Sequence, residues 1–129
     1  MKCPCHSQKP YSECCAPYHR SLNAPTPLIL MRSRYSAYAL GNAEYIIKTT
    51  HPNHPDSSIP APERRKQIKL FCRSSTFKDL EILESTESTV TFKATLTHNG
   101  QDASFTEKSA FAQINDRWYY LGPLDLIKT

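Results

Sequence analysis

No stretch of this 129-residue chain approaches the ~18 consecutive apolar residues that a membrane-spanning helix needs. The N-terminus also lacks the apolar segment of a secretory signal. Lysines and arginines form no run long enough to follow a nucleic-acid backbone, and the net charge of +4 is only mildly basic. We therefore expect a cytoplasmic protein without a membrane span, and the sequence carries no strong nucleic-acid signal.

Internal repeats and low-complexity tracts are also absent, and the length suits one domain with a small appendage. Residues 1–22 hold four of the five cysteines but few aliphatic side chains, so this segment cannot build a hydrophobic core of its own. Residues 23–129 carry the periodic apolar patterns of a folded domain. We predict a division into these two units.

The early cysteines form a tight cluster in the sequence. Disulfides within either close pair would be strained rings, and a reducing compartment disfavours them. Zn²⁺ takes about four thiolate or imidazole ligands in a tetrahedron at ~2.0–2.3 Å, which predicts a metal site here. Free thiols or a redox pair are the alternatives. The predicted ligands are Cys3, Cys5, Cys14 and Cys15, with His6 and His19 in reserve.

Three helices are predicted between residues 25 and 75. The first begins at Thr26, whose hydroxyl can cap the helix ahead of a proline, and ends at Gly41. A second, capped by Asn42, stops before His51, because a residue that precedes proline disfavours the α conformation. A third follows a loop rich in proline and serine and runs from residue 62 to about 74. Apolar residues in the first helix recur at helical spacing: Leu28, Met31, Tyr35 and Tyr38.

The rest of the chain alternates with a period of two, most regularly from Thr89 to Thr97, as expected of a half-buried antiparallel strand. Asn99-Gly100 is a strong hairpin signal, and Asn115-Asp116 predicts a second turn. Helices followed by a strand meander are typical of an α+β fold, with helices on one face of a curved antiparallel sheet.

These turns predict a register in which Phe92 lies opposite Glu107 and Phe111 lies opposite Tyr120. Glu107 is then the only carboxylate on the apolar face of the sheet. A slip of one residue would expose the whole aromatic set, so the hydrophobic pattern opposes it. The predicted apolar face comprises Val90, Phe92, Ala94, Leu96, Phe105, Phe111, Trp118 and Tyr120.

Residues 3–15 resemble the SEC-C motif, a zinc-binding module first recognised in the preprotein translocase ATPase. The run from Leu30 to Tyr38, with Thr50-His51-Pro52 and the late segments around Glu107 and Trp118, resembles the YchJ family of uncharacterised bacterial proteins. The resemblance implies a zinc knuckle followed by a cone-shaped domain of the cystatin and nuclear-transport-factor-2-like kind. Such a domain would place three N-terminal helices on a curved four-stranded sheet. His6 and Gln8 stand where the SEC-C motif usually has glycines.

A cone of this kind often encloses a pocket, and Glu107 is its candidate general base. Arg34 is the best-placed partner for Glu107, as a buried ion pair, within a ligand site or in catalysis. Tyr35, Tyr38 and Trp118 are either core aromatics or ligand-stacking groups, and His51 is a candidate for the pocket mouth.

A zinc ion with four thiolates leaves no open position for an activated water, so the predicted metal is structural. Its net charge of about −2 could be offset by Lys2, Lys9 and Arg20. The basic flanks and the SEC-C resemblance favour an adaptor or accessory protein that docks on a protein, ribosome or translocase component. The alternative is an enzyme or small-ligand binder that uses the pocket around Glu107; a non-enzymatic role is favoured.

Overall fold

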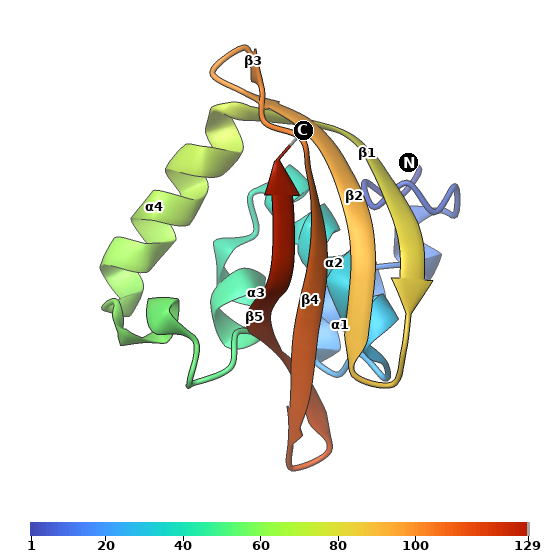
Figure 1. The fold of residues 1–129 in the computed structure, drawn as a ribbon, viewed down its shortest axis with the longest axis vertical. Coiled ribbons are helices and arrows are strands. Elements are labelled where there is room, and N and C mark those ends of the chain that lie inside the picture. Colours follow the sequence, from blue (N-terminus) through green and yellow to red (C-terminus); the bar gives the residue numbers. More distant parts are fainter. Residues whose placement is uncertain (129) are drawn as a thin grey trace.

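The computed structural model describes residues 1–128, so Thr129, the last residue of the predicted second unit, lies outside it. Helices precede strands, which confirms the predicted α+β order. Figure 1 shows α1, α2 and α3 against one face of a curved sheet. No helix in the described range has both the length and the apolar character to cross a membrane. The elements are α1 (Ala16–Ser21), α2 (Pro27–Leu40), α3 (Ala43–Lys48), α4 (Ala61–Arg73), β1 (Ser75–Ser85), β2 (Thr89–His98), β3 (Gln101–Asp102), β4 (Phe105–Ile114) and β5 (Arg117–Lys128), with 3₁₀ turns at Tyr11–Glu13 and Pro55–Ser58.

The helix ends agree with the capping signals in the sequence. The hydroxyl of Thr26 accepts a hydrogen bond from the Ile29 amide at 3.2 Å at the start of α2. Gly41 ends this helix in the left-handed region at φ 73°, and the Asn42 side chain caps α3. Helix α1, which lies inside the predicted knuckle, was not predicted, because its six residues are too few to show a helical period in the sequence.

The sheet has the order β1-β2-β4-β5 with antiparallel neighbours, and the two-residue β3 pairs with the end of β2. Asn99 and Gly100 have φ of 52° and 78°, and Asn115 and Asp116 have φ of 51° and 65°. Positive φ at both central residues is typical of a type I′ hairpin turn. The predicted register is confirmed, with Phe92 opposite Glu107, Ala94 opposite Phe105, Phe111 opposite Tyr120 and Gln113 opposite Trp118.

Curvature of the sheet comes from register shifts in its two outer strand pairs. Two lie between β1 and β2, and two lie between β4 and β5 near Ser109 and Phe111. A bulge bends its strand and increases the local twist, so these shifts wrap the outer strands around the inner face. The buried residues of that face include Val90, Phe92, Ala94, Leu96 and Phe111.

Helix α2 is buried on two sides. On one side, Tyr35 reaches the sheet, and its hydroxyl donates to the backbone oxygen of Asp79 at 2.9 Å. On the other, Ser33 and Ser36 have no exposed surface. Ser33 Oγ lies 2.6 Å from the Tyr45 hydroxyl of α3, and Ser36 Oγ lies 3.2 Å from His19 Nε2 of α1.

The two hairpin turns offer a matched test of backbone strain. Asp116 has φ 65°, whereas the equivalent position of the other turn is already occupied by Gly100. Because glycine adopts positive φ without steric penalty, Asp116→Gly should raise the free energy of unfolding by about 0.5–1 kcal/mol in urea denaturation. Gly100→Ala, the control, should lower it by about 1 kcal/mol or more. Destabilisation by Asp116→Gly would contradict the turn geometry.

A candidate metal centre and a candidate ligand pocket

The sulfur atoms of the four predicted ligands converge on one point. All lie within 4.8 Å of one another. Cys14 Sγ is 3.6 Å from Cys5 Sγ and 3.9 Å from Cys15 Sγ, and all five cysteines of the chain are free. Sulfurs at the corners of a tetrahedron with metal–sulfur bonds of about 2.3 Å are about 3.8 Å apart. The cluster of Cys3, Cys5, Cys14 and Cys15 therefore has the size of a four-thiolate metal site.

The loop that closes this cluster depends on two residues in the left-handed region. His6 and Gln8 have φ of 63° and 72°. The amide of Cys3 donates to the Lys9 carbonyl at 2.8 Å, and the amide of His6 donates to the Cys3 carbonyl at 3.1 Å. His6 and Gln8 thus adopt the conformation for which a SEC-C motif usually employs glycine, at a steric cost of about 1–2 kcal/mol each.

Neither reserve histidine belongs to the cluster found in the described residues. Both ring nitrogens of His19 are engaged, Nδ1 with the Tyr11 hydroxyl at 2.6 Å and Nε2 with the Ser33 carbonyl at 2.8 Å. Burial lowers the pKa of His19, which favours a neutral ring. His6 Nδ1 lies 3.9 Å from an Asp79 carboxylate oxygen on β1. His19 therefore links the cysteine segment to α2, and the candidate ligand set is the four cysteines.

Within the cluster, polar groups favour a thiolate at Cys5. Arg32 Nη1 donates to the Cys5 carbonyl at 3.2 Å and lies 3.9 Å from Cys5 Sγ. Hydrogen bonding from Cys15 is the main cause that lowers the pKa of the Cys5 thiol to about 4, with a further contribution from Ser7. The same Cys5–Cys15 bond, together with burial, raises the pKa of Cys15. A bound metal ion replaces such shared protons, because it needs deprotonated thiolates.

Arg32 is a contact that the sequence analysis missed. The cations expected to offset the site were Lys2, Lys9 and Arg20. Lys2 Nζ instead hydrogen-bonds the Gln8 side chain at 3.2 Å. Arg32 was visible only as part of the YchJ-like run, and its approach to the cluster depends on how α2 packs, which no local pattern shows.

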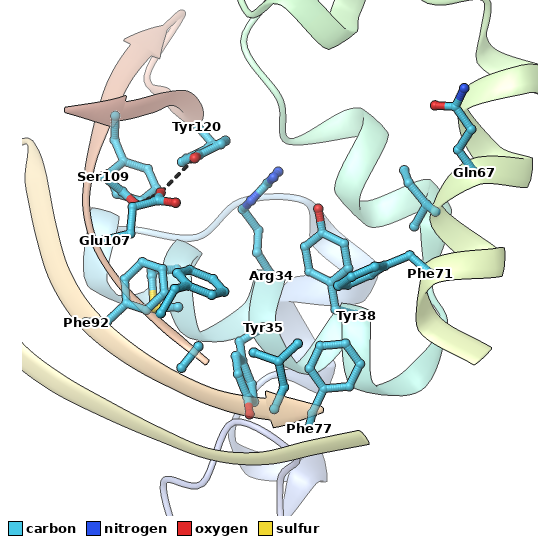
Figure 2. Close-up of a pocket in the computed structure, with 16 residues that line it drawn as sticks. Arg34, Tyr35, Tyr38, Gln67, Phe71, Phe77, Phe92, Glu107, Ser109 and Tyr120 are labelled. Carbon is cyan, nitrogen blue, oxygen red and sulfur yellow. Dashed lines mark hydrogen bonds between the residues drawn. The ribbon is translucent and has the colours of Figure 1, made fainter. Parts of the chain in front are cut away.

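A cavity of about 400 Å³ lies between the inner face of the sheet, α2 and α4 (Figure 2). Small-molecule sites typically measure about 300–1,000 Å³, so the volume suits a small ligand. Of the predicted pocket residues, Arg34, Tyr35, Tyr38 and Glu107 line it. Its walls are mostly apolar and include Phe71, Phe77, Phe92, Phe105 and Phe111.

His51 and Trp118, the other two predicted pocket residues, are not among those that line this cavity. His51 Nδ1 accepts a hydrogen bond from the Asn53 amide at 3.0 Å, and its ring stands edge-on to Tyr119. Trp118 is paired with Gln113 and is partly buried against the hydrophobic core.

The polar end of the cavity is built around Glu107, which is only 8% exposed. Its Oε2 accepts hydrogen bonds from the hydroxyls of Ser109 and Tyr120, the latter at 2.7 Å. Burial, followed by the negative charge of Glu107, raises the pKa of Tyr120, so this hydroxyl stays protonated and donates. Ser109 and Tyr120 were missed as site residues, although two-residue strand spacing from Glu107 already placed Ser109 on the same face.

A direct Arg34–Glu107 ion pair, one of the readings open from the sequence, is not formed: within the described residues no such contact falls within 4.0 Å. The Arg34 guanidinium instead lies over the ring of Tyr120, 4.6 Å from its centroid. Tyr120 thus connects the arginine to the carboxylate through a cation–π contact and a hydrogen bond.

Arg34 also caps the C-terminal end of α3. Its Nη1 donates to the Ile46 carbonyl at 3.1 Å, to Thr49 Oγ1 at 2.8 Å and to Thr50 Oγ1 at 3.2 Å. A second buried arginine, Arg64 of α4, donates to the same Thr50 oxygen at 2.8 Å. Cations suit the carbonyl end of a helix, where the dipole is negative.

The polypeptide backbone fixes Tyr120 beside the same helix end. The Tyr120 amide donates to the Thr49 carbonyl at 2.8 Å, and the Tyr120 carbonyl accepts from the His51 amide at 2.8 Å. These bonds form a parallel bridge between Thr50 and Tyr120. Three segments far apart in the sequence therefore meet at the polar end of the cavity. This end combines a guanidinium, a carboxylate and tyrosine hydroxyls, which can orient a small molecule.

Comparison with known proteins gives matches along nearly the whole chain. The family model described as "YchJ, middle NTF2-like domain" matches residues 26–123. A UPF0225 protein of Deinococcus radiodurans is 36% identical over 120 residues, which cover 92% of this chain and 85% of that protein.

Two solved structures of SEC-C motif containing proteins are similar to this one. That of the Rhodopseudomonas palustris protein has a TM-score of 0.77 and 36% identity, and the match covers 95% of this chain and 97% of that chain. That of the Psychrobacter arcticus protein has a TM-score of 0.76 and 29% identity, with coverage of 96% and 82%. The predicted nuclear-transport-factor-2-like cone is confirmed.

Cysteine substitution tests the metal centre. We expect one metal ion per chain in the wild-type protein and none in Cys14→Ser, measured by mass spectrometry of the gel-filtered protein. The variant should also lose several kcal/mol of stability, because structural zinc contributes about 10–16 kcal/mol of apparent binding free energy in zinc-finger peptides. Cys72→Ser, which removes the one cysteine outside the cluster, should retain the metal. Equal metal content in the two variants would exclude the four-cysteine site.

Proposed function

The chain belongs to the YchJ family, and we propose that it is a zinc-stabilised protein that binds a small molecule in the cone pocket. The observation that carries this proposal is the cavity of about 400 Å³, whose largely apolar walls end in the polar groups of Arg34, Glu107 and Tyr120. Ligand sites are typically clefts with mostly apolar walls and a small number of polar groups. A space of this size, with polar groups converging at one end, favours an occupant.

Zinc is the metal that suits the cluster best. Four thiolates at tetrahedral spacing select Zn²⁺ or iron–sulfur centres among the common biological metals, and four protein ligands leave no position for a reactive water. Cys3, Cys5 and Cys15 belong to the same buried cluster as Leu30 and Tyr35 of α2. We therefore assign the metal a structural role: it holds a SEC-C unit, residues 1–22, against a cone domain, residues 23–129.

Binding is favoured over turnover by the residues available. No histidine, cysteine or lysine lines the described cavity, so Glu107 and the tyrosines are its candidate acids and bases. Glu107 already uses Oε2 to accept two hydrogen bonds. Such a site is well suited to recognise a ligand, with apolar walls that provide affinity and a few polar groups that provide orientation.

Docking through the knuckle is a second candidate function. A groove of about 330 Å³ runs beside the cysteines, between the knuckle and the start of α2. Two cations, Lys9 and Arg32, line it with one carboxylate, Glu13. The partly buried aliphatic side chains of Leu28 and Ile29 add apolar surface. This mixture suits a protein segment with acidic and apolar residues. The SEC-C resemblance makes a ribosomal or translocase component a reasonable partner class.

Filling the cavity tests the pocket function. Ala94 lines the cavity, whereas Thr95 follows it on the opposite face of β2. The neutral dye N-phenyl-1-naphthylamine should become fluorescent on binding the wild-type protein, and Ala94→Phe should weaken binding at least about tenfold, because the added ring occupies the cavity. Thr95→Phe, the matched control, should bind the dye as the wild type does. Equal dye affinity for Ala94→Phe and the wild type would refute the pocket function.

Charge reversal tests docking. Lys2→Glu/Lys9→Glu, with its metal content verified, should recover several-fold less of any partner that the wild-type protein captures in a salt-dependent way from a bacterial lysate. Lys66→Glu/Lys69→Glu makes the same charge change on the exposed side of α4 and should leave recovery unchanged. If all three proteins capture the same partners in equal amounts, the knuckle is not the docking surface.

A further inference from the structure

Arg34 has hydrogen-bonding capacity that the protein does not use. A guanidinium offers five N–H donors, but only Nη1 of Arg34 donates to acceptors in the described residues. Nε and Nη2 have no such partner, although the residue is only 8% exposed. Every fully shielded side-chain nitrogen and oxygen in the described chain has a hydrogen-bond partner. The unused nitrogens must therefore be accessible, and Arg34 lines the cavity.

The charge of Arg34 also lacks a direct counter-ion among the described residues. Glu107 is reached only through Tyr120, whose hydroxyl is committed to Glu107 Oε2. Burial of an unpaired cation is unfavourable, and a guanidinium fork matches the geometry of a carboxylate. An external anion could therefore pair with Arg34 more directly than any group of the described residues does.

Tyr38 provides a second donor beside the arginine. Figure 2 shows its ring on the side of Arg34 away from Tyr120, with the hydroxyl near the guanidinium. This hydroxyl forms no hydrogen bond within the described residues, and burial raises its pKa, so it remains a donor at neutral pH. The rest of the cavity wall is aromatic or aliphatic, which suits the uncharged body of a ligand.

We propose that the ligand of the cone pocket is a small organic anion, a carboxylate on an apolar body, whose head group pairs with Arg34 and Tyr38. This rests on the proposed pocket function and adds the chemical class of the ligand. The single open guanidinium and the largely apolar wall favour one negative charge over a multiply charged phosphate.

A series of ligands with one body and three head groups tests this class in the wild-type protein. The probes are 4-phenylbutyrate, 4-phenylbutan-1-ol and 4-phenylbutylamine, which are anionic, neutral and cationic, with binding measured by calorimetry. The carboxylate should bind at least about tenfold more tightly than the alcohol and the amine, because hydrogen bonds to charged groups are stronger than neutral ones. The wild-type comparison does not depend on whether any variant folds.

Two buried arginines provide the matched variants. Arg34→Gln should remove the preference for the carboxylate while the alcohol still binds. Arg64→Gln, which also removes a bond to Thr50 but from a residue outside the cavity lining, should retain the preference.

The outcomes separate the two proposals. Equal affinity for the carboxylate and the alcohol, or tighter binding of the amine, overturns the anion assignment and leaves the pocket function in place. Binding of N-phenyl-1-naphthylamine without binding of the carboxylate also overturns the assignment. If neither the dye nor any member of the series binds, the pocket function itself fails.

Discussion

Burial of α2 on two sides is the constraint on which the rest of the structure depends. One side carries Ser33 and Ser36, whose small side chains let α1 and α3 approach and bond through His19 and Tyr45. The other side directs side chains such as Tyr35 towards the sheet and the cavity. A helix with a single buried face could position one of these regions but not both. The cysteine cluster and the pocket are therefore held by the same rigid element.

The two candidate sites have complementary chemistry. The cysteine cluster is compact and closed, so a metal there would contribute stability and a fixed surface. The cone pocket retains unused hydrogen-bonding capacity. It contains an arginine with free donors and a carboxylate whose partners are hydroxyls. Under the proposed function, the metal would stabilise one end of α2 and the ligand would be recognised along its sheet-facing side, so each function would place its demands on different residues.

Local patterns were sufficient for the regular elements and for much of the site. Caps at Thr26 and Asn42 and the two hairpin turns determine where elements begin, and the turns set the register that brings Glu107 to the inner face. Contacts set by packing were not predictable. The burial of Ser33 and Ser36 was hidden because serine reads as polar. The link from Arg34 to Tyr120 depends on how α2 packs against β5, which alternation of residues does not reveal.

The double burial of α2 also limits where the chain can change in length during evolution. An inserted residue rotates everything beyond it by about 100° on an α-helix, because a turn contains 3.6 residues. In α2 such a rotation would move Ser33 to the direction in which Arg34 now points and Arg34 to that of Tyr35, so both would lose their present contacts. The 3₁₀ turn Pro55–Ser58 is exposed and links elements without passing through either site. Length variation among relatives should therefore concentrate in that connection, while α2 keeps a constant number of residues.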